Sequence, residues 1–278
     1  MAFHPYHLRE HATMTADTLP SPSVSSPLKV QCRVIAALIL REVHTLYGNT
    51  KLGYLWAVIQ TAFGIGVFWA FRELMGAHAP HGTGMAVFLL CGFIPWYIFS
   101  DTVNRCMKAA SANQALLTFP QVTELDLMLG RLVVVWGTQV LSAGIILSVA
   151  AACGQAVELR DPASLTATLF FAPLLGLGLG LIFASLARFW PTLDKLIPMC
   201  LRILFLASGV FFYVSELPGR LANILLLNPV AQLIEWQRYG FSASSAAPAY
   251  NIVYISAWCA TSLSIGLLLE RYARRRGL

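Results

Sequence analysis

Charged residues are scarce in this sequence, and their scarcity excludes a water-soluble protein. Asp, Glu, Lys and Arg make up 12% of the 278 positions, whereas hydrophobic residues make up 57%. A soluble protein draws about a quarter of its residues from charged types, because they cover its surface. This chain has too few to cover a surface that faces water, so most of it must lie in lipid.

The sequence also lacks the motifs that carry common enzyme chemistry. None of its four lysines (Lys29, Lys51, Lys108 and Lys195) follows a glycine-rich loop, so it has no P-loop with which to hydrolyse ATP. It contains no G-x-S-x-G nucleophile motif and no H-E-x-x-H zinc motif. We therefore expect no catalytic residue and no cofactor in this chain. The energy for any transport must come from another protein.

Metal-binding and disulfide patterns are missing as well. The histidine pairs His7/His11 and His78/His81 supply too few ligands without thiolates beside them, so we expect no metal site. No C-x-x-C motif occurs, and the cysteines are scattered one to a segment, which favours roles as small packing residues. They are Cys32, Cys91, Cys106, Cys153, Cys200 and Cys259.

What the sequence has instead is a series of long apolar stretches. A helix needs about 20 apolar residues to cross the hydrocarbon core, because each residue adds about 1.5 Å. Six stretches reach or approach this length, the fifth with Arg202 inside it. The shorter stretch Leu221–Ile234 contains Asn228-Pro229 and favours a re-entrant or interfacial segment. The predicted spans lie at about residues 52–72, 85–104, 130–153, 163–187, 196–215 and 248–269.

The positions of lysine and arginine predict the orientation of these spans. Fifteen of the 19 lie on the side that holds both termini, and four (Arg72, Arg160, Arg220 and Arg238) lie on the other. Cytoplasmic loops carry the excess of Lys and Arg, so we expect both termini in the cytoplasm. The net charge of +6 then reflects membrane topology. No soluble basic face remains for nucleic acid, and we expect none to bind.

Two segments precede the first span. Residues 1–28 are polar, with three prolines among serines, and predict a disordered cytoplasmic tail rather than a signal peptide. Residues 29–50 contain apolar residues at helical spacing opposite Arg33, Arg41, Glu42 and His44, which predicts an amphipathic helix at the cytoplasmic interface. This helix is either a simple membrane anchor or a docking site for a cytoplasmic partner. The fold class is thus an all-α membrane protein with six transmembrane helices and this interface helix.

Several motifs carry a family resemblance. In chain order they are REVHTLYGNTKLGYLW (41–56), NQALLTFP (113–120), RFWPTLD (188–194), SGVFF (208–212), and LP (217–218) followed by LNP (227–229). Together they resemble the ABC-2 type permeases that export polysaccharides, above all the capsular-polysaccharide permeases of Gram-negative bacteria. Leu46 and Thr61 depart from that family's pattern, which often has Arg and Pro there.

The resemblance implies a set of partners and a function. It implies a homodimer that works with two copies of a P-loop ATPase, which would bind the ATP and Mg, and with a periplasmic or outer-membrane export component. The substrate would be a lipid-linked capsular polysaccharide moved across the inner membrane. The alternatives are export of O-antigen, teichoic acid, a drug or a small lipid by the same type of permease, or a non-transporting membrane scaffold for polysaccharide assembly.

The resemblance also assigns roles to residues. The loop 105–124 would be the coupling helix that contacts the ATPase, with an apolar tip formed by Leu116 and Leu117; an ordinary interfacial turn is the alternative. The predicted coupling residues are Arg41, Glu42, Tyr47, Arg105, Lys108, Asn113, Leu116 and Leu117.

Spans one and five would line the channel, where aromatic faces suit sugar rings, although interfacial belts also collect aromatic residues. The predicted channel residues are Tyr54, Trp56, Phe63, Phe68, Phe211, Phe212 and Tyr213. The resemblance implies that residues 216–247 form a periplasmic gate of two short re-entrant helices before the last span. The gate residues are Asn228, Pro229, Glu235 and Arg238, and the last two have the i,i+3 spacing of a helical ion pair. Glycines 64, 66, 176, 178 and 180 would permit close helix contacts, with the first two near the dimer seam.

Overall fold

The computed structural model describes residues 27–47, 53–76, 84–119, 121–155, 157–241 and 249–276. Within these ranges every regular element is helical, as the sequence predicts. The α-helices are α1 (Pro27–Tyr47), α2 (Gly53–Leu74), α3 (Met85–Met107), α4 (Glu124–Ala152), α5 (Pro162–Ala187), α6 (Leu193–Leu206), α7 (Gly219–Leu225), α8 (Pro229–Phe241) and α9 (Ile252–Arg275), and the short 3-10 helices are η2 (Ser111–Leu116) and η3 (Val214–Glu216).

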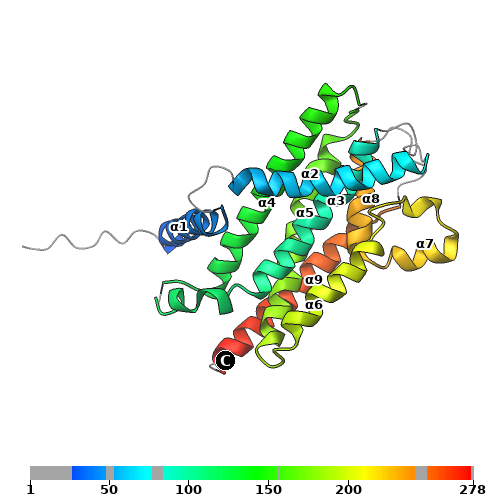
Figure 1. Ribbon diagram of the computed structural model, residues 1–278. Helices are drawn as coiled ribbons and strands as arrows, with labels where there is room; N and C mark the ends of the chain where they lie inside the picture. The colour runs from blue at the N-terminus through cyan, green and yellow to red at the C-terminus, as the bar shows by residue number, and fades with distance from the viewer. Residues whose placement is uncertain are drawn as a thin grey trace, which may run out of the picture.

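Four of these helices, α3, α4, α5 and α9, are long and apolar enough to cross a membrane. They run side by side along the long direction of the molecule, and α2 lies across them (Figure 1). Helix α3 forms the centre, because most of its residues are buried against α4, α5 and α8. A helix satisfies its own backbone hydrogen bonds, so such segments are stable where no water is present.

Glycines on α5 set how closely it approaches its neighbours. A Cβ added to Gly176 would lie 2.9 Å from the carbonyl oxygen of Phe99 on α3, and one added to Gly180 would lie 2.7 Å from Cys106 Cβ. On the other face, Gly178 packs against Ser262 of α9. The predicted close contacts at these three glycines are therefore confirmed. Gly66 has no atom within 4 Å of an added Cβ among the described residues, so its place at a dimer seam stays a prediction.

Helix α1 begins two residues earlier than predicted, at Pro27. Proline is well tolerated in the first turn, where its missing N–H has no helical partner anyway. Residues 27 and 28 thus belong to the helix, while 1–26 and 48–50 of the predicted tail and interface helix lie outside the described residues. Leu38 is buried against Gly130 of α4, whereas Leu40 is 65% exposed. One side of the helix therefore packs against α4, and its predicted place in the membrane interface stays a prediction.

The fifth predicted span is wrong in its extent. Helix α6 covers 193–206 rather than 196–215, and its 14 residues are too few to cross the hydrocarbon core. The helix ends at Leu206, and in the turn that follows Gly209 adopts a positive φ of 71°, a left-handed conformation that glycine adopts without strain. The residues after it turn back into the protein and continue into η3. In α2 the described apolar stretch is Val58–Arg72, which is shorter than a membrane-spanning helix needs to be.

Other boundaries shift without changing the order of elements. Helix α4 begins at Glu124 instead of residue 130, because Thr123 and Asp126 form a capping box there. Helix α3 continues to Met107, and α9 runs from Ile252 to Arg275. The predicted loop 105–124 is correspondingly shorter, with η2 at its centre. In the predicted gate, two helices flank Asn228, as expected, although residues 242–247 lie outside the described ranges.

Candidate functional site

The ends of several helices meet at one end of the molecule. Here η2 and the start of α4 lie near the end of α9 and the turn from α5 to α6, with α1 beside them (Figure 1). The lysines and arginines of the α3, α5 and α9 C-terminal ends gather at this end. This is the region in which the sequence places contacts with an ATPase.

Helix α1 is attached to α4 and α3 by buried polar contacts. Glu42 Oε1 lies 3.2 Å from Arg131 Nε, and both side chains are only about a tenth exposed, at 11% and 12%. Arg131 Nη1 also donates a hydrogen bond of 2.8 Å to the carbonyl oxygen of Arg105. Gln31 donates to the buried carboxylate of Asp126. Helix α1 is therefore bound to the bundle along one side.

A second link joins α1 to η2. Arg41 Nη2 donates a hydrogen bond of 2.7 Å to Asn113 Oδ1. Asn113 is buried, and its Nδ2 donates at 3.0 Å to the carbonyl oxygen of Ala109. Two neighbouring residues of α1 thus make separate contacts: Arg41 with Asn113 of η2, and Glu42 with Arg131 of α4.

The remaining predicted coupling residues lie elsewhere. Leu116 and Leu117 are half-buried and pack against the core formed by α1, α4 and α5. Among the described residues of this loop, the large apolar side chain that is exposed is instead Phe119, at 59%. Arg105 and Lys108 line a cavity between α3 and α6. The side chain of Tyr47 lies outside what the structure describes.

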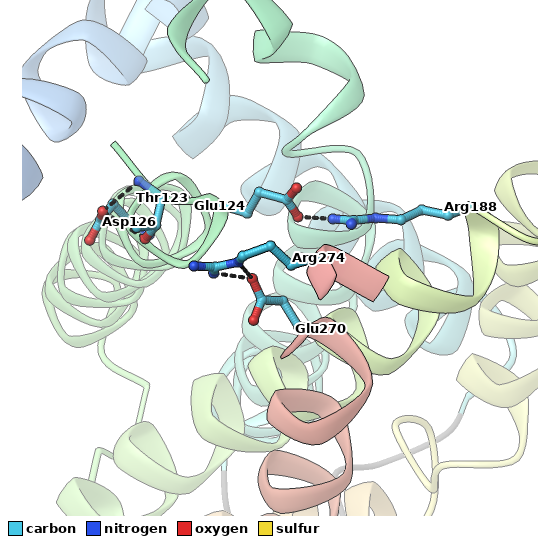
Figure 2. Close-up of polar contacts among 6 residues, drawn as sticks. All are labelled: Thr123, Glu124, Asp126, Arg188, Glu270 and Arg274. Atoms are coloured by element: carbon cyan, nitrogen blue, oxygen red, sulfur yellow. Dashed lines mark hydrogen bonds and ion pairs between the residues drawn. The ribbon is translucent and has the colours of Figure 1, made fainter. Parts of the chain in front are cut away.

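The start of α4 carries polar contacts that the sequence reasoning missed (Figure 2). Thr123 N donates to Asp126 Oδ2 at 2.8 Å, and Asp126 N donates back to Thr123 Oγ1 at 3.3 Å. Glu124 pairs with Arg188 after α5, and close to them Arg274 pairs with Glu270 on α9. The capping box and the i,i+4 spacing of Glu270 and Arg274 are visible in the sequence; the Glu124–Arg188 pair, 64 residues apart, is not.

The Glu42–Arg131 pair should contribute measurably to the attachment of α1. We expect a double-mutant cycle of Glu42→Gln and Arg131→Gln, read from thermal unfolding of the purified chain, to give a coupling energy of about 0.5–3 kcal/mol, because the pair is largely shielded from water. Single and double variants with additive effects would contradict this link. The pair Glu270→Gln and Arg274→Gln is a matched cycle: Arg274 is half-exposed, so its coupling should be smaller.

The predicted gate contains a buried ion pair. Arg238 Nη1 lies 3.3 Å from Glu235 Oε1, which confirms the helical pair expected from their spacing. Arg238 is 2% exposed, and its guanidinium lies 4.2 Å from the ring centre of Phe88 on α3. It donates to the carbonyl oxygens of Phe212 and Val210, each at 2.7 Å, and Glu235 accepts from Val214 N at 3.0 Å. The pair therefore ties α8 to the segment that follows α6.

Asn228 and Pro229 hold the start of α8. Asn228 Oδ1 accepts a hydrogen bond from Val230 N at 3.0 Å, which caps the helix, and its Nδ2 donates to Ser208 Oγ at 2.9 Å. Nearby, Gln232 donates to the carbonyl oxygen of Leu226 and accepts from Asn251 N. All four predicted gate residues thus lie in one region, joined to the turn after α6 and to the start of α9.

The predicted channel aromatics divide into two groups. Trp56 and Phe63 on α2 are 68% and 71% exposed. Phe68 and Phe211 pack together, with ring centres 4.3 Å apart, and Tyr213 is buried beside Arg238. Phe212 is half-buried, and the side chain of Tyr54 lies outside what the structure describes. Surface for a ligand is therefore offered by Trp56 and Phe63, while Phe68, Phe211 and Tyr213 serve packing in this chain.

Comparison with known proteins places this fold in a family. The family described as "ABC-2 type transporter" matches residues 33–242. The polysialic acid transport protein KpsM of Escherichia coli is 29% identical over 88% of this chain and 95% of its own length. The capsule polysaccharide export inner-membrane proteins CtrC of Neisseria meningitidis and BexB of Haemophilus influenzae are 25% and 26% identical, over 92% and 88% of this chain and 97% and 92% of their own lengths. The chain therefore belongs to the ABC-2 type transporter family.

Proposed function

We propose that this chain is the membrane-spanning subunit of an ATP-driven exporter that moves a lipid-linked capsular polysaccharide across the bacterial inner membrane. The observation that carries the proposal is the similarity to capsule-export proteins over nearly the full length of both chains. The sequence has no P-loop, so the ATPase would be a separate protein. Two copies of each would form the working assembly.

The membrane arrangement in this proposal has six crossings and both termini in the cytoplasm. Besides the four long helices, the proposal needs α2, which lies across them in this structure, to align with them, and α6 to cross together with the apolar residues that follow it. Helices α7 and α8 would re-enter from the periplasm. The excess of lysine and arginine at the end that holds η2 and the last turn of α9 supports this orientation. That end would face the ATPase, and the α7–α8 end would hold the gate.

Deleting the gene tests the exporter proposal against its rivals. We expect polymer to accumulate inside the cells and to leave the surface, and a plasmid copy of the chain to restore its surface location. Polymer that reaches the surface normally without the chain would overturn the proposal. Polymer that is made in smaller amounts but still reaches the surface would favour an assembly scaffold. Normal polymer export with altered resistance to a drug or lipid would favour export of a small substrate.

Phe119 should be important for coupling to the ATPase. It is the exposed apolar side chain of the loop around η2, and such side chains bind apolar grooves on partners. We expect Phe119→Asp to leave the chain folded and inserted but to reduce polymer export about tenfold or more, because a charge would be forced into that groove. Surface polymer and membrane-fraction levels of the chain are the measurements.

Two further variants separate this role from a folding effect. Phe119→Tyr keeps the ring and should export normally. Leu117→Asp should reduce the amount of folded chain, because Leu117 packs against the core beside α1. Unchanged export by Phe119→Asp would contradict the coupling role.

A further inference from the structure

A cavity of about 710 Å³ opens between α3 and α6, next to the start of α4. Its size falls in the range of small-ligand pockets, roughly 300–1,000 Å³. Its walls combine three kinds of side chain: cations, hydrogen-bond acceptors and aromatic rings. Each kind restricts the chemistry of an occupant.

The charges of the cavity favour an anion. Its walls carry Arg105, Lys108, Arg131 and Arg202 but a single carboxylate, Asp101. Arg131 is already paired with Glu42, and Arg105 lies one helical turn beyond Asp101.

Lys108 and Arg202 differ from Arg131, which already has partners. In the part of the chain that the structure describes, neither side chain makes a hydrogen bond or an ion pair. Both residues are exposed in this chain, so an anion from a ligand can reach them, and such an anion would stabilise the cation that Arg202 places in the otherwise apolar helix α6.

The other side chains favour a hydroxyl-bearing ring beside that anion. Asn104 uses its Nδ2 to bond the carbonyl oxygen of Ser100, while its Oδ1 is buried without a hydrogen-bond donor among the described residues. A ligand hydroxyl would satisfy this acceptor. Trp96 and Phe205, whose ring centres are 5.3 Å apart, form an aromatic wall, and the C–H face of a sugar ring packs well on such a surface.

We infer that this cavity binds an anionic glycan segment on its way into the exporter. Arg202 and Lys108 would hold the carboxylate or phosphate, Asn104 would accept from a sugar hydroxyl, and the wall of Trp96 and Phe205 would pack against the ring. A bare lipid phosphate would use the cations but would leave the aromatic wall without a partner. The inference rests on the proposed export of a polysaccharide and names the charge that the substrate carries.

Binding to the purified full-length chain tests the inference without the ATPase. The chain is placed in nanodiscs of phosphatidylcholine, and the probes are a sialic acid oligomer and the same oligomer with its carboxylates converted to methyl esters. We expect the acid to bind and the ester to bind at least about tenfold more weakly, because charge-assisted hydrogen bonds are lost. Arg202→Gln and Lys108→Gln should each weaken binding of the acid about tenfold, with little effect on the ester.

Control variants keep the result specific to the cavity. Arg202→Lys retains the charge and should retain most of the binding. Arg271→Gln removes an exposed arginine of α9 outside the cavity and should bind normally. Equal binding of acid and ester, no binding of either, or unchanged binding by the Arg202→Gln/Lys108→Gln double variant would overturn the inference. So would competition by phosphatidylglycerol in the nanodiscs that displaces the acid completely, since the site would then be a lipid site.

Failure of the inference and failure of the proposed function give different results. If the chain is required for polymer to reach the surface but does not discriminate acid from ester, the exporter stands and the anion site falls. If the acid binds as expected but polymer reaches the surface in the deletion strain, the site stands and the exporter falls.

Discussion

Replacing Arg238 by methionine should lower the free energy of unfolding by about 3–5 kcal/mol, because it leaves a buried carboxylate without its cation. Glu235 would keep one hydrogen bond, from Val214 N, and the carbonyl oxygens of Val210 and Phe212 would both lose a donor. The measurement is thermal unfolding of the purified chain in detergent, followed by tryptophan fluorescence. A stability equal to that of the native chain would show that the pair is not buried as described.

Two further variants give this result its reference points. Arg220 lies on the exposed surface of α7, so Arg220→Met should change stability by no more than about 0.5 kcal/mol. The double variant Arg238→Met/Glu235→Met removes both charges together and should recover much of the loss, since an apolar pair fills the site without an unpaired ion. A double variant as unstable as Arg238→Met would assign the effect to the lost carbonyl contacts instead.

Adding a single methyl group at Gly178 should be the second large effect. Its Cβ would lie 2.9 Å from the backbone nitrogen of Leu263, and backbone cannot move aside as a flexible side chain can. From the opposite helix, Gly266 approaches the carbonyl oxygen of Gly178, so α5 and α9 meet here with almost no side chain between them. We expect Gly178→Ala to lower stability by about 1–3 kcal/mol, through forced separation of the two helices.

The matched control is Gly144→Ala on α4. A Cβ added to Gly144 meets no atom within 4 Å among the described residues, so the same substitution should be neutral or stabilise the helix by up to about 1 kcal/mol. Thermal unfolding of the two variants side by side separates helix propensity from helix contact. Equal effects in the two would contradict the close approach of α5 and α9.

The sequence predicted the helices better than it predicted where they end. A long apolar run in lipid must form a helix, and for this reason α3, α4, α5 and α9 could be predicted from the sequence. The sequence could not reveal the end of α6, because the residues after Leu206 remain apolar. The turn there includes the positive φ of Gly209, which an apolar pattern does not predict. Apolarity reports the solvent of a segment, whereas a helix end depends on backbone geometry.

The sequence predicted which residues belong to the candidate site better than it predicted which of them are paired, buried or exposed. Arg41 and Asn113, both predicted to act in coupling, do contact each other, because polar residues in a lipid-bound chain need partners. Glu42 was also predicted, but its partner Arg131 was not, since only the packing of α1 on α4 brings the two together. Leu117 and Phe119 are equally apolar, and only the packing of the loop against α1 decides which one is exposed. Arg238 has the spacing of a surface pair, and its burial depends on residues on α3 and after α6.

The attachment of α1 to α4 has a mechanical consequence. A helix that lay in the headgroup layer without contacts to the bundle would move through the fluid lipid when a cytoplasmic partner displaced it, and would pass little of that movement on. Fastened through Glu42 to Arg131 and through Arg41 to Asn113, α1 instead shares a rigid frame with η2 and the foot of α4. A movement of η2 should therefore move α1 and the start of α4 with it, without loss to the surrounding lipid.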